Sequence, residues 1–274
     1  SVYDTFVNAG YDGRELYGIT YLSPTEQRSP QSNYHRPAQF ERVLTFIDEV
    51  KEFTGSDQVD IVTHSLGVST TLAALTWHDE TQPEAPSAWS GVRRFVNIDG
   101  GLHGLGSCRL VGPANPMVST CGSENPVDPY TSGIQPDGSG LAANSWTSAD
   151  APHSLRSMPA KHLQTRFYTI HAGAHDQVHC GLGSRSGECA EGALFTAAPN
   201  VRAQLDVGTG STPTDADFDF SDGSAYATGG GDIDGVGHFK ARNNSGAILV
   251  QMLTGDCTGE ACAVQYAGPV TAKP

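Results

Sequence analysis

The serine at position 65 lies at an abrupt change of sequence pattern. Residues 59–64 (VDIVTH) form a short, largely apolar run of strand length, and residues 66–75 are small, apolar and compatible with a helix. Only Ser65 separates the two runs, so the turn between them is a single residue. Such a turn strains the backbone, requires small neighbours such as Gly67, and raises the serine side chain above a sheet edge. A strand that leads directly into a helix is typical of α/β folds.

The rest of the chain also alternates between strand-like and helix-like patterns. Apolar residues recur at mostly three- to four-residue spacing from Phe40 to Val50, which predicts a helix over residues 38–54, ended by Gly55. This alternation indicates an α/β fold with a mostly parallel central sheet flanked by helices. Strands are expected at residues 16–22, 59–64, 95–98, 166–171 and 203–207.

Composition limits the domain organisation and the partners. The chain has 274 residues, of which 38% are hydrophobic, so we expect one domain over residues 1–274. A formal net charge of −14 argues against nucleic acid and anionic membranes as partners and favours an uncharged substrate. Residues 102–160 and 208–237 are rich in loop-forming residues and are expected as loop excursions over the active-site edge of the sheet. We further expect a monomer.

The six cysteines fall into three pairs that are close in sequence. Sequential pairing closes the shortest loops at the lowest entropic cost, although six cysteines allow about fifteen pairings. No pair has the C-x-x-C spacing of zinc or redox sites. We therefore expect structural disulfides, an oxidising compartment and a secreted, extracellular protein. The expected pairs are Cys108 with Cys121, Cys180 with Cys189, and Cys257 with Cys262.

Residues 63–67 (THSLG) have the pattern of a nucleophile elbow, G-x-S-x-G, with threonine replacing the first glycine. Ser65 is the expected nucleophile, and the Leu66 amide at the helix start is the expected oxyanion donor. His238 is the only histidine beyond residue 179 and lies in a glycine-rich loop, so it is the expected general base. This chemistry requires no cofactor.

Two aspartates compete to orient His238. Asp99 follows the strand expected at 95–98, and Asp176 follows the strand expected at 166–171. Asp176 comes after the penultimate expected strand, where the triad acid usually lies, so it is preferred over Asp99.

Other candidates carry weaker signals. Tyr34 and His64 are candidates for contact with the substrate, although packing explains His64 more simply. His171, His175 and His179 have helical spacing, but intervening glycine argues against a helix and hence against a metal site. Asp215, Asp217 and Asp219 have calcium-loop spacing, but Phe220 and Tyr226 occupy positions that require glycine and glutamate, so no metal is expected.

Several segments resemble the extracellular poly(3-hydroxybutyrate) depolymerases of the lipase-like type. The similarity runs nearly from end to end. It implies an α/β-hydrolase fold, a secreted enzyme that cuts amorphous aliphatic polyester, and a triad of Ser65, Asp176 and His238. The segments that carry it are residues 17–23 (YGITYLS), 33–35 (NYH), 59–69 (VDIVTHSLGVS), 158–161 (MPAK), 176–178 (DQV), 229–232 (GGGD), 237–239 (GHF) and 257–262 (CTGEAC).

The resemblance also implies a further strand, whose exit turn supplies a second oxyanion amide. Ser1 aligns after that turn, so we expect that a preceding segment was cleaved or left out. A substitute loop amide and weak activity are the alternatives, because losing one oxyanion donor costs on the order of 10²–10³ in rate.

Other functions remain open at this stage. The same geometry would accept aromatic polyesters such as polyethylene terephthalate, or short acyl esters as cutinases and lipase-like carboxylesterases do. A triacylglycerol lipase requires a more apolar lid than residues 208–237 offer. A polymer-binding module without catalysis is the alternative from another class.

Overall fold

Four parallel strands form the centre of the fold. The computed structural model describes residues 2–28, 35–112, 119–122, 133–136, 146–180, 183–185, 190–208 and 237–264. Within these ranges the sheet has the order β1-β2-β3-β4, and every neighbouring pair is parallel. The four strands agree with four of the expected ones, with earlier starts for β2 and β4. Their bounds are Val59–His64 for β1, Val92–Ile98 for β2, Arg166–His171 for β3 and Val201–Asp206 for β4.

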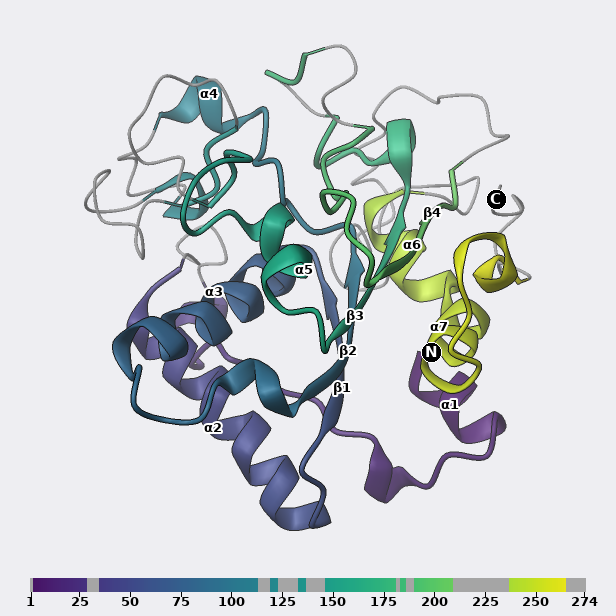
Figure 1. Ribbon diagram of the computed structural model, residues 1–274. Coiled ribbons are helices and arrows are strands. Elements are labelled where there is room, and N and C mark those ends of the chain that lie inside the picture. The colour runs from purple at the N-terminus through teal and green to yellow at the C-terminus, as the bar shows by residue number, and fades with distance from the viewer. Residues whose placement is uncertain are drawn as a thin grey trace.

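Helices cover both faces of the sheet (Figure 1). Helices α2 and α3 lie on one face, and α1, α6 and α7 lie on the other. Parallel strands need helices on both faces because neither face can remain in water. The bounds are α1 Val2–Asn8, α2 Pro37–Thr54, α3 Leu66–Thr81, α4 Cys108–Val111, α5 Met158–Lys161, α6 His238–Asn244 and α7 Gly246–Thr254.

Each face of the sheet has its own apolar core. Phe95 and Phe167 pack with α2 and α3, whereas Val96 and Tyr168 pack with α6 and α7. All four side chains are fully buried. Successive strand residues point to opposite faces, so the continuous apolar runs of β2 and β3 supply both cores.

The predicted helix over residues 38–54 is confirmed as α2. It ends at Gly55, which adopts the left-handed conformation with φ of 67°. The Gly55 amide donates to the carbonyl oxygen of Glu52. This ending agrees with the glycine stop signal in the sequence.

The strand expected at residues 16–22 is wrong. These residues form neither a strand nor a helix. A strand needs a neighbour that completes its hydrogen-bond ladder, and among the described residues β1 pairs with β2 alone. The apolar pattern of residues 16–22 therefore has no partner strand beside it.

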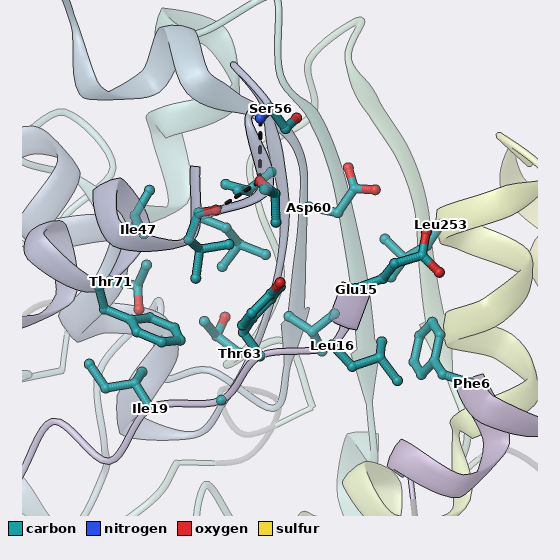
Figure 2. A pocket seen from close by; sticks show the side chains of 18 of the residues that line it. Phe6, Glu15, Leu16, Ile19, Ile47, Ser56, Asp60, Thr63, Thr71 and Leu253 are labelled. Carbon is teal, nitrogen blue, oxygen red and sulfur yellow. Dashed lines mark hydrogen bonds between the residues drawn. The ribbon is translucent and has the colours of Figure 1, made fainter. Parts of the chain in front are cut away.

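A large groove lies between residues 16–21 and the edge of β1 that no described strand pairs with (Figure 2). Its volume is about 1600 Å³. Every residue of β1 lines it, together with apolar side chains of α2 such as Ile47 and of the extended segment such as Leu16 and Ile19. Val62, in the middle of β1, is 38% exposed although its strand is a largely apolar run of sequence. Apolar surface of the kind that is normally buried thus faces an open groove.

Two of the expected disulfides are confirmed. Cys108 bonds to Cys121, and Cys257 bonds to Cys262. Cys180 is also disulfide-bonded, and its expected partner Cys189 lies outside the described residues. In the part of the chain that the structure describes, none of the helices is both long and apolar enough to cross a membrane.

A buried histidine makes the stability of this core depend on pH. His35 is 1% exposed, and its Nε2 lies 2.9 Å from Ser69 Oγ. Burial lowers the pKa of His35 from 6.5 to about 4. Between these two values the unfolded chain binds a proton that the folded protein excludes, so acid favours unfolding.

We predict that His35→Gln flattens the pH dependence of stability. For the parent, the free energy of unfolding should fall by up to about 1.4 kcal/mol per pH unit through His35 as the pH drops from 6.5 to about 4. Glutamine keeps a polar group near Ser69 but takes up no proton. Urea unfolding across this range measures the slope, and identical slopes in parent and variant would contradict the prediction.

Candidate active site

Ser65 occupies the one-residue turn between β1 and α3. Its φ of 56° and ψ of −132° are strained for a residue with a side chain. The backbone is held there by a hydrogen bond from the Ser65 amide to the carbonyl oxygen of Ile98, 2.9 Å away at the end of β2. The elbow expected from the sequence is therefore present, and it directs Ser65 Oγ toward His238.

The expected crowding at Gly67 is not present. A Cβ placed on Gly67 would meet no atom within 4 Å among the described residues, and Gly67 lines the groove beside β1. The requirement for a small residue there would arise only if further chain occupied this groove.

His238 is the first residue of α6 and lies 1% exposed beside Ser65. Its Nε2 is 2.8 Å from Ser65 Oγ, and its Nδ1 is 2.9 Å from Asp176 Oδ2. The His238 amide donates to Gln177 Oε1 at 2.8 Å. A carboxylate accepts from Nδ1–H, which leaves the Nε2 lone pair facing the serine hydroxyl. This is the tautomer that can take a proton from Ser65.

Asp176 is the acid that the structure places on His238. It follows β3 through a short 3₁₀ turn, Gly173–His175. Its Oδ1 accepts from the amides of Val178 at 2.9 Å and His179 at 2.8 Å. Of the two candidates in the sequence, Asp176 and not Asp99 makes the contact with the histidine.

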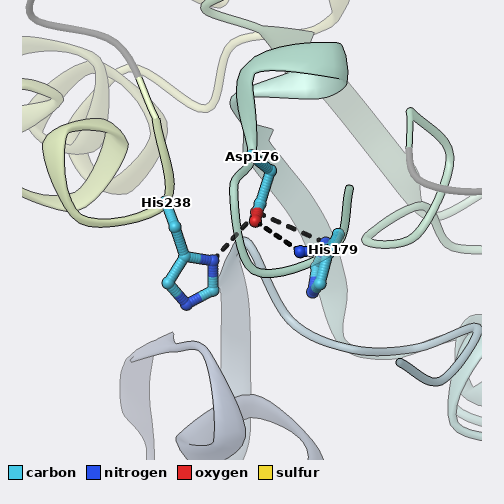
Figure 3. Close-up of side chains that lie close together, drawn as sticks. All are labelled: Asp176, His179 and His238. Atoms are coloured by element: carbon cyan, nitrogen blue, oxygen red, sulfur yellow. Dashed lines mark hydrogen bonds and ion pairs between the residues drawn. The ribbon is translucent and has the colours of Figure 1, made fainter. Parts of the chain in front are cut away.

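A second imidazole also reaches Asp176 (Figure 3). His179 Nδ1 lies 3.3 Å from Asp176 Oδ2, the oxygen that also faces His238. Burial alone raises the pKa of Asp176, but the charges of His179 and His238 and their hydrogen bonds outweigh it and hold this pKa well below its usual range. Burial lowers the pKa of His179 itself to about 4. At neutral pH His179 is therefore uncharged, and Asp176 is an ionised carboxylate that faces two imidazoles.

His64 supports the backbone of His238. Its Nε2 donates to the carbonyl oxygen of His238 at 2.9 Å, and the two rings lie 4.8 Å apart. Burial lowers the pKa of His64 to about 3, so the ring is neutral. This contact agrees with the packing interpretation of His64. The other expected substrate contact, Tyr34, lies outside the described residues, as do Asp215, Asp217 and Asp219.

The potential metal ligands are the residues of this same centre. In the described ranges, the one group whose atoms could surround an ion is Asp176, His179 and His238, with ligand atoms within 4.8 Å of one another. His171 and His175 are not part of it, so the set with helical spacing does not converge. Asp176 already contacts both histidines, through a hydrogen bond to His238 and an ion-pair contact with His179, so we interpret the three side chains as a relay centred on Asp176.

Sequence reasoning missed the supporting residues. Gln177 and His179 both follow closely after Asp176 in the sequence, and this position was the only available signal. The contact of Gln177 with His238 joins segments far apart in the sequence, whereas His179 contacts Asp176 within the same loop.

Comparisons with known proteins find similarity to lipases. The family model of class 2 lipases matches residues 1–134, a range that contains Ser65. Among solved structures, lipase B of Aspergillus fumigatus is similar with a TM-score of 0.50 and 15% identity. The similarity covers 89% of this chain and 49% of the lipase, so the chain spans about half the length of that protein. No curated protein sequence matches the chain.

Fold and comparison together define the class of protein. The parallel sheet flanked by helices and the structural similarity establish the α/β-hydrolase fold. The match of residues 1–134 to the class 2 lipase model supports the prediction of a serine hydrolase that acts on carboxylic esters. The prediction of the fold class is confirmed.

We predict that His64→Phe lowers kcat for p-nitrophenyl butyrate roughly ten-fold with little change in KM. The variant keeps an aromatic ring but loses the hydrogen bond to the His238 carbonyl, and one such bond is worth about 1–2 kcal/mol. His64→Gln, which retains a donor, is the matched control and should lose less. Equal losses in the two variants would show that the hydrogen bond is unimportant.

Proposed function

We propose that this chain is a secreted serine esterase that hydrolyses poly(3-hydroxybutyrate), with Ser65, His238 and Asp176 as its catalytic triad. The observation that supports this most directly is the continuous hydrogen-bonded line from Ser65 Oγ through both nitrogens of His238 to Asp176 Oδ2. This line provides a nucleophile, a base in the correct tautomer and a buried charge that stabilises the imidazolium.

The mechanism is two-step acyl transfer. Ser65 Oγ attacks the ester carbonyl carbon while its proton moves to His238 Nε2, and the negative charge of Asp176 stabilises the resulting imidazolium. Leu66 is the first residue of α3, so its amide has no acceptor within the helix and can donate to the oxyanion. His238 then protonates the leaving alcohol. Water, deprotonated by His238, cleaves the acyl-enzyme and releases the acid.

Substrate class and location rest on the sequence and the disulfides. The resemblance to the poly(3-hydroxybutyrate) depolymerases supports a polyester, and a net charge of −14 favours an uncharged chain over an anionic one. The disulfides support an oxidising, extracellular location. The monomeric state and the absence of nucleic acid and membrane partners are parts of the same proposal.

A second candidate substrate class is favoured by the lipase comparison. The match of residues 1–134 to the class 2 lipase model supports a lipase-like carboxylesterase acting on smaller acyl esters. The catalytic residues and their roles would be the same, so only the preference among substrates distinguishes this candidate from the polyester hydrolase.

Release of soluble acid from amorphous poly(3-hydroxybutyrate) tests the proposal. We expect release by the parent and a loss on the order of 10⁶ in rate for Ser65→Ala, because the nucleophile is removed. Polyethylene terephthalate, p-nitrophenyl butyrate and a triacylglycerol emulsion are the comparison substrates. Labelling by a fluorophosphonate reports whether Ser65 is reactive at all.

The outcomes separate the candidates. Cleavage of p-nitrophenyl butyrate without release from the polyester would overturn the substrate and leave the esterase. Adsorption to the polymer with an unlabelled Ser65 would instead indicate a binding module.

The edge of β1 that no described strand pairs with suggests a source for the second oxyanion donor. We propose that a further strand lies along β1 in the groove and that the turn after it brings a backbone amide to the oxyanion. The groove follows all of β1 from Val59 to His64, it is rich in apolar side chains, and it includes the uncrowded Gly67. A strand there would cover Val62 and give residues 16–22 a partner, as an exposed edge requires.

We predict that the β1 amides that point away from β2 exchange slowly with deuterium, because the further strand would pair with them. Rapid exchange of these amides would count against the strand. In that case another loop must supply the amide.

A further inference from the structure

A second buried carboxyl group lies against the triad acid. Asp99 directly follows β2 and is fully buried. Its φ of 46° is in the left-handed region, which aspartate and asparagine tolerate better than most residues. The Asp99 amide donates to the carbonyl oxygen of Ile170 at 3.0 Å, and Asp99 Oδ1 accepts from the amide of Ala172 at 2.9 Å. The backbone at the ends of β2 and β3 thus holds Asp99 in place.

The second carboxyl oxygen of Asp99, Oδ2, is buried and has no hydrogen-bond donor among the described residues. The carboxyl groups of Asp99 and Asp176 interact directly, and this interaction raises the pKa of Asp99. A buried acceptor without a donor costs about 1–3 kcal/mol, and two carboxylates in contact also repel each other. A single proton between the two groups removes both costs.

The surrounding charges place this proton on Asp99. Burial raises the pKa of Asp99, and the negative charge of Asp176, with a smaller contribution from Asp206, raises it further. The imidazoles of His179 and His238 face Asp176, together with the amides of Val178 and His179. Asp99 receives one amide, from Ala172. Asp176 therefore has more hydrogen-bond donors than Asp99, and these donors stabilise its ionised form.

We propose that Asp99 is a positioning residue that carries a proton at neutral pH and donates it in a hydrogen bond to Asp176. The bond holds the carboxylate that orients His238 and keeps the site at one negative charge. This role deepens the proposed function, because it concerns the same triad.

Two substitutions at one position separate the roles of Asp99. Asparagine has nearly the shape of the protonated acid, donates through its amide and tolerates the left-handed backbone. Glycine also accepts this backbone but removes the side chain altogether. We expect Asp99→Asn to retain kcat for p-nitrophenyl butyrate within about three-fold, whereas Asp99→Gly should lose roughly ten- to one-hundred-fold with KM little changed.

A spectroscopic measurement tests the proton without relying on turnover. The infrared difference spectrum between parent and Asp99→Asn at neutral pH should contain the carbonyl band of a protonated carboxyl group, assigned to Asp99. Absence of this band would overturn the proposal. So would a loss in Asp99→Asn as large as that in Asp99→Gly, because it would mean that Asp99 acts through a charge.

Asp176→Asn is the matched control. It should lose on the order of 10⁴ in kcat, because Asp176 supplies the charge and the histidine tautomer. If Asp176→Asn were harmless, the proposed triad would fail. The infrared band would still decide whether Asp99 holds a proton, so the two failures are distinguishable.

Discussion

One negative charge, taken out of water at Asp176, sets the requirements for the whole active site. A buried carboxylate is stable only when donors surround it, and Asp176 has two backbone amides and two imidazoles. His238 is one of these donors, so satisfying the carboxylate also orients the base. The bond from the His238 amide to Gln177 and the bond from His64 to the His238 carbonyl fix the same residue from its backbone. The hydrogen bond that stabilises the buried Asp176 carboxylate therefore also fixes the orientation of His238.

The parallel sheet supplies the positions for these groups. Strands β1, β2 and β3 are in register, with His64 beside Ile98 and Ile98 beside Ile170. Ser65 and Asp99 follow the first two of these strands directly, and Asp176 follows β3 after one short turn. Carboxyl ends of parallel strands meet at one edge, so residues far apart in sequence lie together without any long-range sequence signal. His238 completes the site from a different kind of element, because it is the first residue of helix α6.

Local signals in the sequence were enough to predict much of this arrangement. The one-residue turn at Ser65 and the helix stop at Gly55 depend on the residues next to them, and both are present. The preference for Asp176 over Asp99 relied on strand order, which the apolar runs determine well. The supporting contacts of Gln177, His179 and Asp99 could not be predicted in this way. They depend on which loops meet in three dimensions and on where protons reside among buried groups.

The segment 16–22 shows where local pattern ceases to be sufficient. Its apolar residues are suited to a strand, but a strand also requires a partner strand. Among the described residues, β1 pairs only with β2, and no strand pairs with residues 16–22. The same missing neighbour explains the exposure of Val62 and the empty surroundings of Gly67. The sequence pattern indicates which segments can form strands, whereas the structure shows whether a partner strand is present. One extended segment in the groove would explain three features together, because it would pair with β1, bury Val62 and fill the space beside Gly67.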